Sequence, residues 1–499
     1  MTTIARGLDT LTRDALTVLQ PGFPGTTAPD WLLRRLGEGL ASVGLFGRNI
    51  ASPEQLSALT AQLRAERDDV LVAIDEEGGD VTRLEVRTGS SFPGNCALGA
   101  VDDVDLTREV AYELGRRLAE CGVNLNWAPS ADVNSNPANP VIGVRSFGAD
   151  PALVARHTAA YVTGLQAAGV AACTKHFPGH GDTAVDSHHA LPRIDVPAEA
   201  LAERELVPFL AAIGAGSRAI MSAHILVPAL DPIRPATLSR PILTDLLRRD
   251  HGYEGLIVTD GMEMQAVAAT YGIERGSVLA IAAGADAICV GGGLSDDATV
   301  RRLRDALVTA VRTGELPEER LADAAERVRA LARWTGSAPE STGEPVPDVG
   351  LVAARRALRA TGADTFTPLT DPPYVAALTP VANIAVGDET PWGVAAELAR
   401  LLPGTQTGSF SGGNGENGED VARAVLVAAG ERQIVAVVRD EHRHPWMATA
   451  LDTLLTTRPD TIVVEMGVPQ AVPRGALHIA THGAARVCGR AAAEVIAGP

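Results

Sequence analysis

Residues 170–183 read VAACTKHFPGHGDT, and this stretch joins an apolar run to a dense group of polar side chains. The run Val170–Cys173 has the composition of a buried strand, whereas the glycines and the proline beyond it end regular structure. Lysine, histidine and aspartate therefore gather on a loop held by a rigid element, where catalytic groups are often found. Together with DSHH at residues 186–189, the loop is interpreted as a functional site rather than a solvated surface turn.

Similar apolar runs recur between residue 15 and about residue 335 and alternate with longer amphipathic segments, such as 107–121 and 153–168. Eight strand–helix alternations predict a (β/α)8 TIM-type barrel, with a doubly wound open sheet as the alternative. The expected strands are Ala15–Leu19, Val43–Phe46, Val70–Ile74, Val123–Trp127, Val170–Cys173, Ala219–Met221, Leu256–Val258 and Ala287–Val290.

Polar residues follow five of these expected strands. Barrel enzymes carry their sites at the carboxyl ends of the strands, so one barrel mouth would gather all of these side chains. A doubly wound sheet would collect polar groups mainly at one crevice, so the pattern favours the barrel. The residues concerned are Asp75, Glu76, Glu77, Asp132, Asn134, Lys175, His176, His224 and Asp260.

A second domain is predicted beyond a stretch rich in Pro, Gly and Ser. The expected organisation is a catalytic barrel domain at 1–335, a linker at 336–349 and a C-terminal domain at 350–499. Strand-like runs at Ile384–Val386, Ile434–Val438 and Ile462–Glu465 alternate there with helical patterns. They predict a smaller three-layer α/β/α sandwich.

Composition limits the classes of partner. The 499-residue chain carries a net charge of −18, which argues against nucleic acid and anionic membranes as partners. The N-terminal residues lack an apolar signal segment, and the five cysteines are scattered, so we expect reduced thiols and a cytoplasmic location. No disulfide framework, cofactor motif or zinc spacing is recognisable, so no cofactor or metal is expected; a monomer and a homodimer both remain open.

Two carboxylate positions suggest the chemistry. Asp260 directly follows the apolar run Leu256–Val258, and it could either cap a helix or act as a nucleophile on a sugar anomeric carbon. Asp186 lies two residues before His188, so its carboxylate could fix the tautomer of an imidazole that donates and accepts protons. Metal binding by the loop histidines is the competing interpretation, whereas His180, between two glycines, is expected to brace the loop.

The loop and three further motifs resemble the family 3 glycoside hydrolases, and more narrowly their β-N-acetylglucosaminidase branch. The motifs are DEEGG at 75–79, RSFG at 145–148 and TDGM at 259–262, in the family's order. The resemblance covers residues 15 to about 335, and the second domain is similar to the sandwich of two-domain members. It implies a (β/α)8 barrel and a retaining mechanism, with a small GlcNAc-containing carbohydrate as the substrate.

The resemblance also implies the role of individual residues. Asp260 aligns with the nucleophile, His188 with the acid/base and Asp186 with its partner. Side chains that would line the pocket for the terminal sugar are Asp75, Arg83, Arg145, Lys175 and His176. The family more often has Gln at position 76 and Arg at position 80, where this chain has Glu76 and Asp80, so the range of substrates is left open.

Three alternatives remain at this point. The acetamido group of the substrate could itself attack the anomeric carbon in place of Asp260. Phosphate could replace water in the second step, because a histidine acid/base is neutral after losing its proton and repels an anion less than a carboxylate does. A non-catalytic sugar-binding protein on a barrel scaffold is the third alternative.

Overall fold

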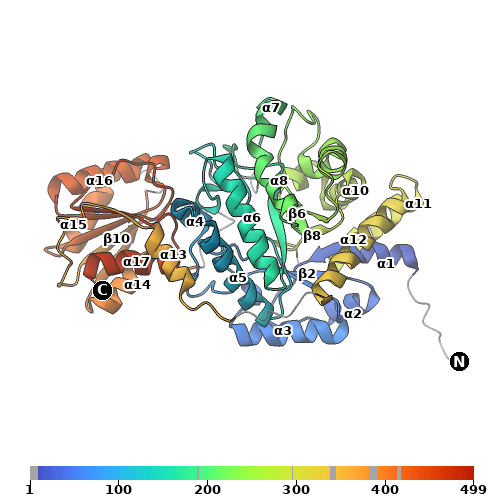
Figure 1. Cartoon of the computed structure of the whole chain (residues 1–499), viewed down its shortest axis with the longest axis horizontal. Helices are drawn as coiled ribbons and strands as arrows, with labels where there is room; N and C mark the ends of the chain where they lie inside the picture. Colours follow the sequence, from blue (N-terminus) through green and yellow to red (C-terminus); the bar gives the residue numbers. More distant parts are fainter. Residues whose placement is uncertain are drawn as a thin grey trace. The chain divides into compact units, whose positions relative to one another are not determined.

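Eight short parallel strands form the centre of the N-terminal part of the chain in a computed structural model (Figure 1). The structure describes residues 9–187, 190–294, 296–337, 344–380, 390–412 and 417–498. The strands are β1 (Leu19–Pro21), β2 (Ser42–Leu45), β3 (Leu71–Ile74), β4 (Leu125–Asn126), β5 (Ala171–Phe177), β6 (Ala219–Ser222), β7 (Leu256–Thr259) and β8 (Ile288–Val290).

The strands pair in chain order. A six-stranded sheet runs β2-β3-β4-β5-β6-β7, β1 pairs with β8, and a single parallel bridge joins Val258 of β7 to Ala287. The result is an α/β fold with a curled parallel half-barrel. This order excludes the doubly wound alternative, in which the strand order reverses at a switch point.

Seven of the eight expected strands lie within a few residues of the observed ones, but the first was wrong. Residues 15–17 belong to helix α1 (Thr10–Thr17), and β1 begins only at Leu19. The Asp9 carboxylate accepts a hydrogen bond from the backbone N–H of Thr12 at 2.8 Å, which caps this helix. The apolar residues Ala15 and Leu16 are therefore the buried face of a helix and not a strand.

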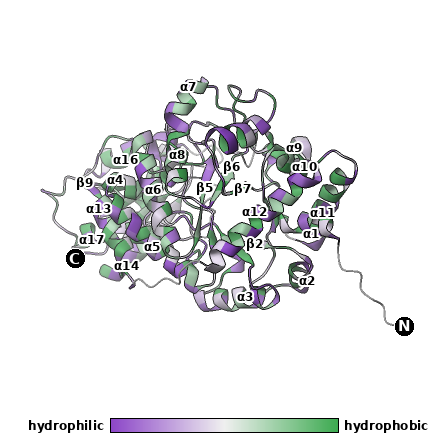
Figure 2. Cartoon of the chain, turned by 45° about the vertical axis from the view of Figure 1, so that its right-hand side comes forward, coloured by the Kyte–Doolittle hydropathy of each residue, from purple (hydrophilic) through white to green (hydrophobic). Residues whose placement is uncertain are grey.

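Helices alternate with the strands and surround them, and in Figure 2 they carry mixed hydrophilic and hydrophobic colours. Helix α1 packs against α11 and α12. The helices and helical turns are α2 (Asp30–Glu38), η1 (Gly47–Asn49), α3 (Pro53–Glu66), α5 (Val104–Glu120), α6 (Pro151–Ala167), α7 (Ala198–Ala200), η3 (Leu201–Glu205), α8 (Val207–Gly214), η4 (Ala236–Leu238), η5 (Pro241–Asp250), α9 (Gln265–Tyr271), α10 (Ile273–Ala283), α11 (Asp297–Arg312) and α12 (Glu318–Ser337).

Apolar side chains fill the interior of the curled sheet, most of them small or medium in size, with Trp127 as a large exception. Inward residues alternate along each strand, as in Leu71 and Ala73 of β3 or Leu256 and Val258 of β7. Val328, Leu331 and Ala332 of α12 belong to the same buried cluster. The interior is therefore a packed core and not a pore.

A second sheet contains the C-terminal strands and is mixed. Its order is β11-β10-β12-β13-β14-β9, and β9 alone among these paired strands runs antiparallel to its neighbour. Its elements are β9 (Arg359–Thr361), β10 (Tyr374–Leu378), β11 (Gln406–Phe410), β12 (Ile434–Val438), β13 (Ile462–Glu465), β14 (Leu477–Ala480), α13 (Val349–Ala357), α14 (Ala395–Leu401), α15 (Gly418–Ala429), η6 (Glu441–Arg443), α16 (Pro445–Thr457) and α17 (Arg486–Ala497).

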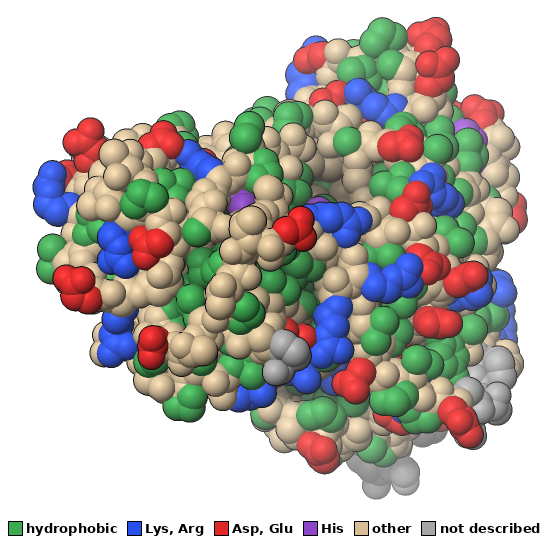
Figure 3. All heavy atoms as spheres, turned by 60° about the vertical axis from the view of Figure 1, so that its left-hand side comes forward, with side chains coloured by type: hydrophobic (Ala, Val, Ile, Leu, Met, Phe, Trp, Pro, Cys, Tyr) green, Lys and Arg blue, Asp and Glu red, His purple; other side chains and the backbone are tan. Residues whose placement is uncertain are grey.

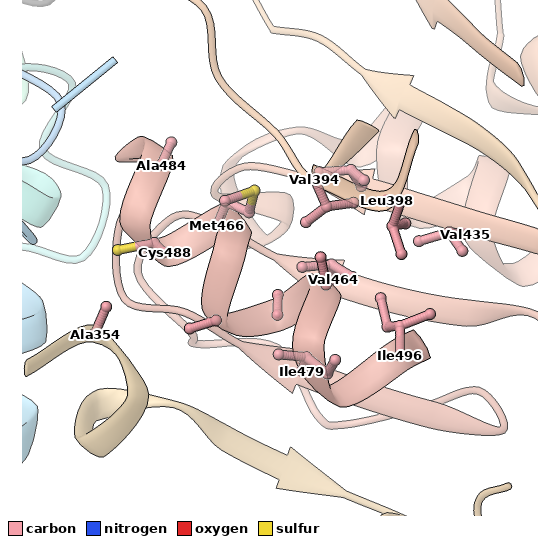
Figure 4. Close-up of a cluster of buried hydrophobic side chains, with 14 of the residues drawn as sticks. Ala354, Val394, Leu398, Val435, Val464, Met466, Ile479, Ala484, Cys488 and Ile496 are labelled. Atoms are coloured by element: carbon pink, nitrogen blue, oxygen red, sulfur yellow. The ribbon is translucent and has the colours of Figure 1, made fainter. Parts of the chain in front are cut away.

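Each face of this sheet has its own hydrophobic cluster. On one face, side chains of β12, β13 and β14 meet those of α14 and α17, as Val435, Val464, Ile479, Leu398 and Ile496 show in Figure 4. On the other face, side chains of α15 and α16 pack against the alternate residues of β10 and β12. The expected strands at 434–438 and 462–465 are present, whereas the run at 384–386 lies outside the described residues.

Contacts divide the chain into two units, and one boundary between them, after Pro345, lies within the predicted linker at 336–349. The first unit comprises residues up to Glu76, Thr107–Pro140 and Asp150–Pro345. The second comprises Glu77–Leu106, Val141–Ala149 and the residues from Val346 onward, and so includes α4 (Asn95–Val101) and η2 (Gly143–Arg145).

Charges are dispersed over the surface, as Figure 3 shows for one face, where Lys and Arg alternate with Asp and Glu. None of the helices in the described part of the chain is both long enough and apolar enough to cross a membrane.

Candidate active site

Because side chains alternate between the two faces of a strand, three charged residues are expected on the inner face of the curled sheet. Two residues beyond the inward Ala73 of β3 comes Asp75, and two beyond the inward Val258 of β7 comes Asp260. Lys175 follows Cys173 of β5 at the same spacing. The apolar layers are therefore continued, at the carboxyl ends of the strands, by a layer of charged groups.

Lys175 of β5 and Asp75, the residue that follows β3, form an ion pair, although β4 lies between these two strands in the sheet. Only 2% of the lysine side chain is exposed, so its ammonium group would be costly to bury without this carboxylate. The sequence predicted that regular structure ends before Lys175, but β5 continues through Phe177. The strand can continue through these polar residues because partners inside the fold satisfy their side chains.

Asp132 connects β5 to the loop that follows. Its Oδ2 lies 2.7 Å from Nδ1 of His176 and accepts a hydrogen bond from the Ser130 hydroxyl at 2.9 Å. Its Oδ1 accepts the backbone N–H groups of His176 at 3.2 Å and His180 at 2.7 Å. Burial acts to raise the pKa of this carboxyl, but the neighbouring His176 and the other donors hold it well below the usual range. Asp132 is therefore an anion at neutral pH.

His180 braces the loop, as expected from its position. Its Nδ1 lies 2.8 Å from the Thr183 hydroxyl, and its Nε2 lies 3.4 Å from that of Ser187. Burial, the largest cause, and the neighbouring His176 together lower the pKa of His180 to about 4, although Asp132 opposes the shift. The imidazole is therefore neutral near pH 7 and serves as a hydrogen-bonding element.

Asp260 does not cap a helix. The next helix, α9, begins at Gln265 and has Met264 at its N-cap position. The Asp260 Oδ1 accepts the N–H of Gly261 at 2.8 Å, and the carbonyl of Gly261 lies 3.0 Å from Nε2 of His224. The other ring nitrogen of His224 lies 2.8 Å from the Thr237 hydroxyl, so this turn is fixed from both sides.

Electrostatic effects indicate that the three charged residues lie near one another. Burial raises the pKa of the Cys173 thiol, Lys175 lowers it, and Asp75 and Asp260 raise it. Asp260 also acts on the pKa of His180. A cation and two carboxylates therefore lie within electrostatic range of the Cys173 thiol on β5.

The proposed acid/base pair is described only in part. Asp186 is half-buried, and its carbonyl accepts the N–H of Ala190 at 3.1 Å. The next residue, Ser187, is buried, and its carbonyl accepts the N–H of Ala266 in α9 at 3.3 Å. His188 lies outside the described residues. The described histidines, cysteines and carboxylates include no group of three that could hold a metal ion.

Arg83 and Arg145 belong to the second unit. The guanidinium of Arg145 makes a bidentate pair with Glu77, with distances of 2.7 Å and 3.0 Å, and both side chains are buried. Arg83 is partly exposed and follows the bridge between Gly78 and Val81. Sequence reasoning did not foresee the Arg145–Glu77 pair, because the two residues are 68 positions apart.

Other polar residues at the strand ends were missed. Glu263 accepts the N–H of Gly291 at 3.0 Å and also that of Gly292, so it ties the turn after β7 to the end of β8. Its position three residues beyond Asp260 was the available signal. Arg204 and Glu205, in the π-helical turn η3, carried no signal, because charged residues are ordinary in a helical pattern.

Comparison with known proteins defines the class. Residues 30–331 match the family described as Glycosyl hydrolase family 3 N terminal domain. The chain therefore belongs to glycosyl hydrolase family 3.

Two curated relatives and one solved structure are similar to this chain. Beta-hexosaminidase A of Pseudoalteromonas piscicida is 37% identical over 312 residues, covering 58% of this chain but only 52% of that protein's length. Beta-hexosaminidase of Chromobacterium violaceum is 38% identical over 258 residues, covering 50% of this chain and 71% of that protein. The structure of a family 3 beta-N-acetylglucosaminidase from Paenibacillus sp. str. FPU-7 superposes with a TM-score of 0.86 at 34% identity, covering 98% of this chain and 97% of that one.

Proposed function

We propose that the chain is a retaining, exo-acting β-N-acetylglucosaminidase that removes terminal non-reducing β-linked GlcNAc from small glycosides, such as chito-oligosaccharides or muropeptide fragments. The observation that carries this proposal is the position of Asp260 directly after β7, where it acts on the same buried thiol, Cys173, as Lys175 and Asp75 do. The similarity to named hexosaminidases along the barrel supports the choice of sugar.

In the proposed first step, the Asp260 carboxylate attacks the anomeric carbon as the bond to the leaving oxygen breaks. The imidazolium of His188 gives its proton to that oxygen, and Asp186 stabilises the charged ring. Water then attacks the glycosyl ester, His188 takes the proton of the water, and Asp260 leaves as a carboxylate. Two inversions give net retention.

The sugar is proposed to be held by hydrogen bonds from charged groups. Lys175 can supply the ammonium N–H groups that it does not donate to Asp75, and Asp75 can supply carboxylate acceptors, at the layer that continues the core. His176, fixed through Nδ1 by Asp132, can direct Nε2 toward a hydroxyl group. Arg83 and Arg145 are retained as candidates for further sugar contacts.

Three further inferences, on barrel closure, domain organisation and compartment, belong to the same proposal. We infer that the eight strands close into a complete (β/α)8 barrel, which the Val258–Ala287 bridge and the β1–β8 pair support. The sandwich is inferred to be a separate C-terminal domain, which its own two hydrophobic clusters support. A reducing compartment such as the cytoplasm is inferred from five cysteines that are all free.

A small panel of nitrophenyl β-glycosides tests the proposal. We expect turnover of the GlcNAc glycoside with retention at the anomeric carbon, and turnover of the glucoside at least about 100-fold slower, because sites built for polar groups reject analogues lacking them. If GlcNAc-1-phosphate forms when phosphate is added, the reaction is phosphorolysis and not hydrolysis. Binding of GlcNAc without any turnover would revive the sugar-binding alternative.

A further inference from the structure

The segment that carries Asp186 is held at both ends by hydrogen bonds. Near its start, the Asn139 amide donates to the carbonyls of His180 at 2.9 Å and Gly181 at 3.0 Å. Near its end, the buried Ser187 is bonded through its carbonyl to α9. Between these ends, Thr183 is buried and bonded to His180, whereas residues 184 and 185 are exposed, so Asp182 offers a further point at which the middle of the segment can be held.

Arg204 holds Asp182. Its guanidinium lies 2.6 Å from Oδ2 of Asp182 and 2.7 Å from Oε1 of the adjacent Glu205, so one cation links the loop to η3. Asp182 is 26% exposed and Arg204 is 29% exposed, whereas Glu205 is fully buried. The Arg204–Asp182 pair is therefore partly buried, and Arg204 also contacts the carboxylate of Glu205, which has no access to water.

A carboxyl group buried at the position of Glu205 costs folding free energy, unless its pairing with Arg204 serves to hold the loop. Its second oxygen, Oε2, finds no hydrogen-bond partner among the described residues. A Cβ atom on Gly179 would lie 2.7 Å from that oxygen, so the start of the loop runs directly over the carboxyl group. Burial raises the pKa of Glu205 to about 7, Arg204 opposes the shift, and the carboxylates of Asp132 and Asp182 add to it.

The turn itself is unusual in the same place. Residues 201–205 form a π-helical turn between α7 and α8, a form that occurs mostly as single turns and often at functional sites. Arg204 and Glu205 are the last two residues of this turn. Both reach the loop in this structure.

We propose that Arg204 is a positioning residue for proton transfer: by pairing at once with Asp182 and Glu205, it fixes the 179–187 segment that places Asp186. The inference rests on the proposed function, and it adds a residue from η3 to the machinery. Because Arg204 acts through the loop and not on the sugar, its loss affects proton donation to the leaving group more than attack by Asp260.

Substrates with different leaving groups separate these effects. Chitobiose needs a proton on its leaving oxygen, whereas a 2,4-dinitrophenyl β-GlcNAc glycoside does not. The ratio kcat/KM reports the steps up to the first bond cleavage. For Arg204→Ala we expect kcat/KM to fall about 100-fold with chitobiose, the low end of general-acid contributions, and less than about 3-fold with the dinitrophenyl glycoside.

Two further variants guard the interpretation. Asp182→Asn breaks the same pair from the loop side and leaves Glu205 in place, so it should show the same split even if Arg204→Ala fails to fold. Arg193→Ala removes a solvent-exposed ion pair with Asp195 at a nearby position in the sequence. This control variant should leave kcat/KM unchanged with both substrates. Equal losses on both substrates for Asp182→Asn, or no loss on either, would overturn the proposal. A wild-type chain inactive on both glycosides would instead contradict the proposed function.

Discussion

Nδ1 of His176 lies 2.7 Å from Oδ2 of Asp132, 44 residues earlier in the chain, and this contact joins the carboxyl end of strand β5 to the segment after β4. The same carboxylate accepts two backbone N–H groups and one hydroxyl. A fully buried acceptor of four hydrogen bonds determines how His176 is oriented toward the proposed sugar site.

Replacing Asp132 by Asn should therefore destabilise the fold. The amide cannot accept from all four donors and presents an N–H group to one of them, so we expect a loss of about 3 kcal/mol in the free energy of unfolding. Asp195→Asn, which touches only an exposed arginine, should change stability by less than about 1 kcal/mol. Urea unfolding of both variants checks this, and equal stabilities would contradict it.

Glu205 should make stability depend on pH. Its pKa rises from an ordinary 4.5 to about 7 on folding, so the stabilisation it contributes is complete below about pH 4.5 and is lost as the pH rises through 7. Glu205→Gln has no such ionisation. The stability of the wild type relative to this variant should fall by about 3 kcal/mol between pH 4.5 and pH 8. A difference that stays constant over this range in thermal unfolding would argue against the buried carboxyl.

The buried pair of Arg145 and Glu77 should tolerate lysine poorly. Arg145→Lys keeps the charge but loses the two-pronged geometry, and we expect a cost of about 2 kcal/mol in stability. Arg355 offers a matched control, because it also pairs with both oxygens of a glutamate, Glu494, but is 50% exposed. Arg355→Lys should cost less than about 1 kcal/mol. Similar effects at both positions would show that burial of the first pair is not decisive.

A chain ending at Ser337 should fold poorly. The sequence favours an independent barrel, but helices α4 and α13 pack together, and Gly350 approaches the carbonyl of Ser91 so closely that a Cβ there would lie 2.0 Å away. Truncation exposes the α4 surface and leaves its partners unpaired. We expect aggregation on expression, judged by size-exclusion chromatography.

A full-length chain cut by an inserted protease site between Ser337 and Glu344 provides the control. The two pieces should stay associated through residues of the second unit, such as Asp103 and Arg356, which form an ion pair of 2.8 Å. A stable, monodisperse and active chain ending at Ser337 would contradict the role assigned to these contacts.

Local sequence was sufficient for seven of the eight strands of the first unit, because each is a short apolar run, and polar residues follow five of the eight expected runs. It failed at β1, where the helix cap at Asp9 claimed the apolar residues for α1. In the second unit, the missed edge strands β9 and β11 read Arg-Ala-Thr and Gln-Thr-Gly-Ser-Phe. Edge strands of this kind bury little, so they carry no apolar run from which to predict them.

The site divides in the same way. Asp75, Lys175 and Asp260 could be selected because a charge directly after a buried run is expensive without a purpose. The pairs Asp132–His176, Arg145–Glu77 and Arg204–Asp182 depend on tertiary contacts over 44, 68 and 22 residues, which no local pattern encodes. The catalytic and sugar-binding roles proposed for these residues remain predictions from the family motifs, as do those of Asp186, His188 and Arg83.

The central claim is that Asp260 forms the covalent intermediate. A 5-fluoro β-GlcNAc fluoride tests it most directly, because the fluorine slows both steps while the good leaving group lets the first proceed, and the acetamido group is retained. Mass spectrometry of the peptides should find the sugar on Asp260, and Asp260→Asn should remain unlabelled. Turnover of the fluoride, or inhibition of the protein by it, without any label on Asp260 would contradict the claim and favour attack by the acetamido carbonyl.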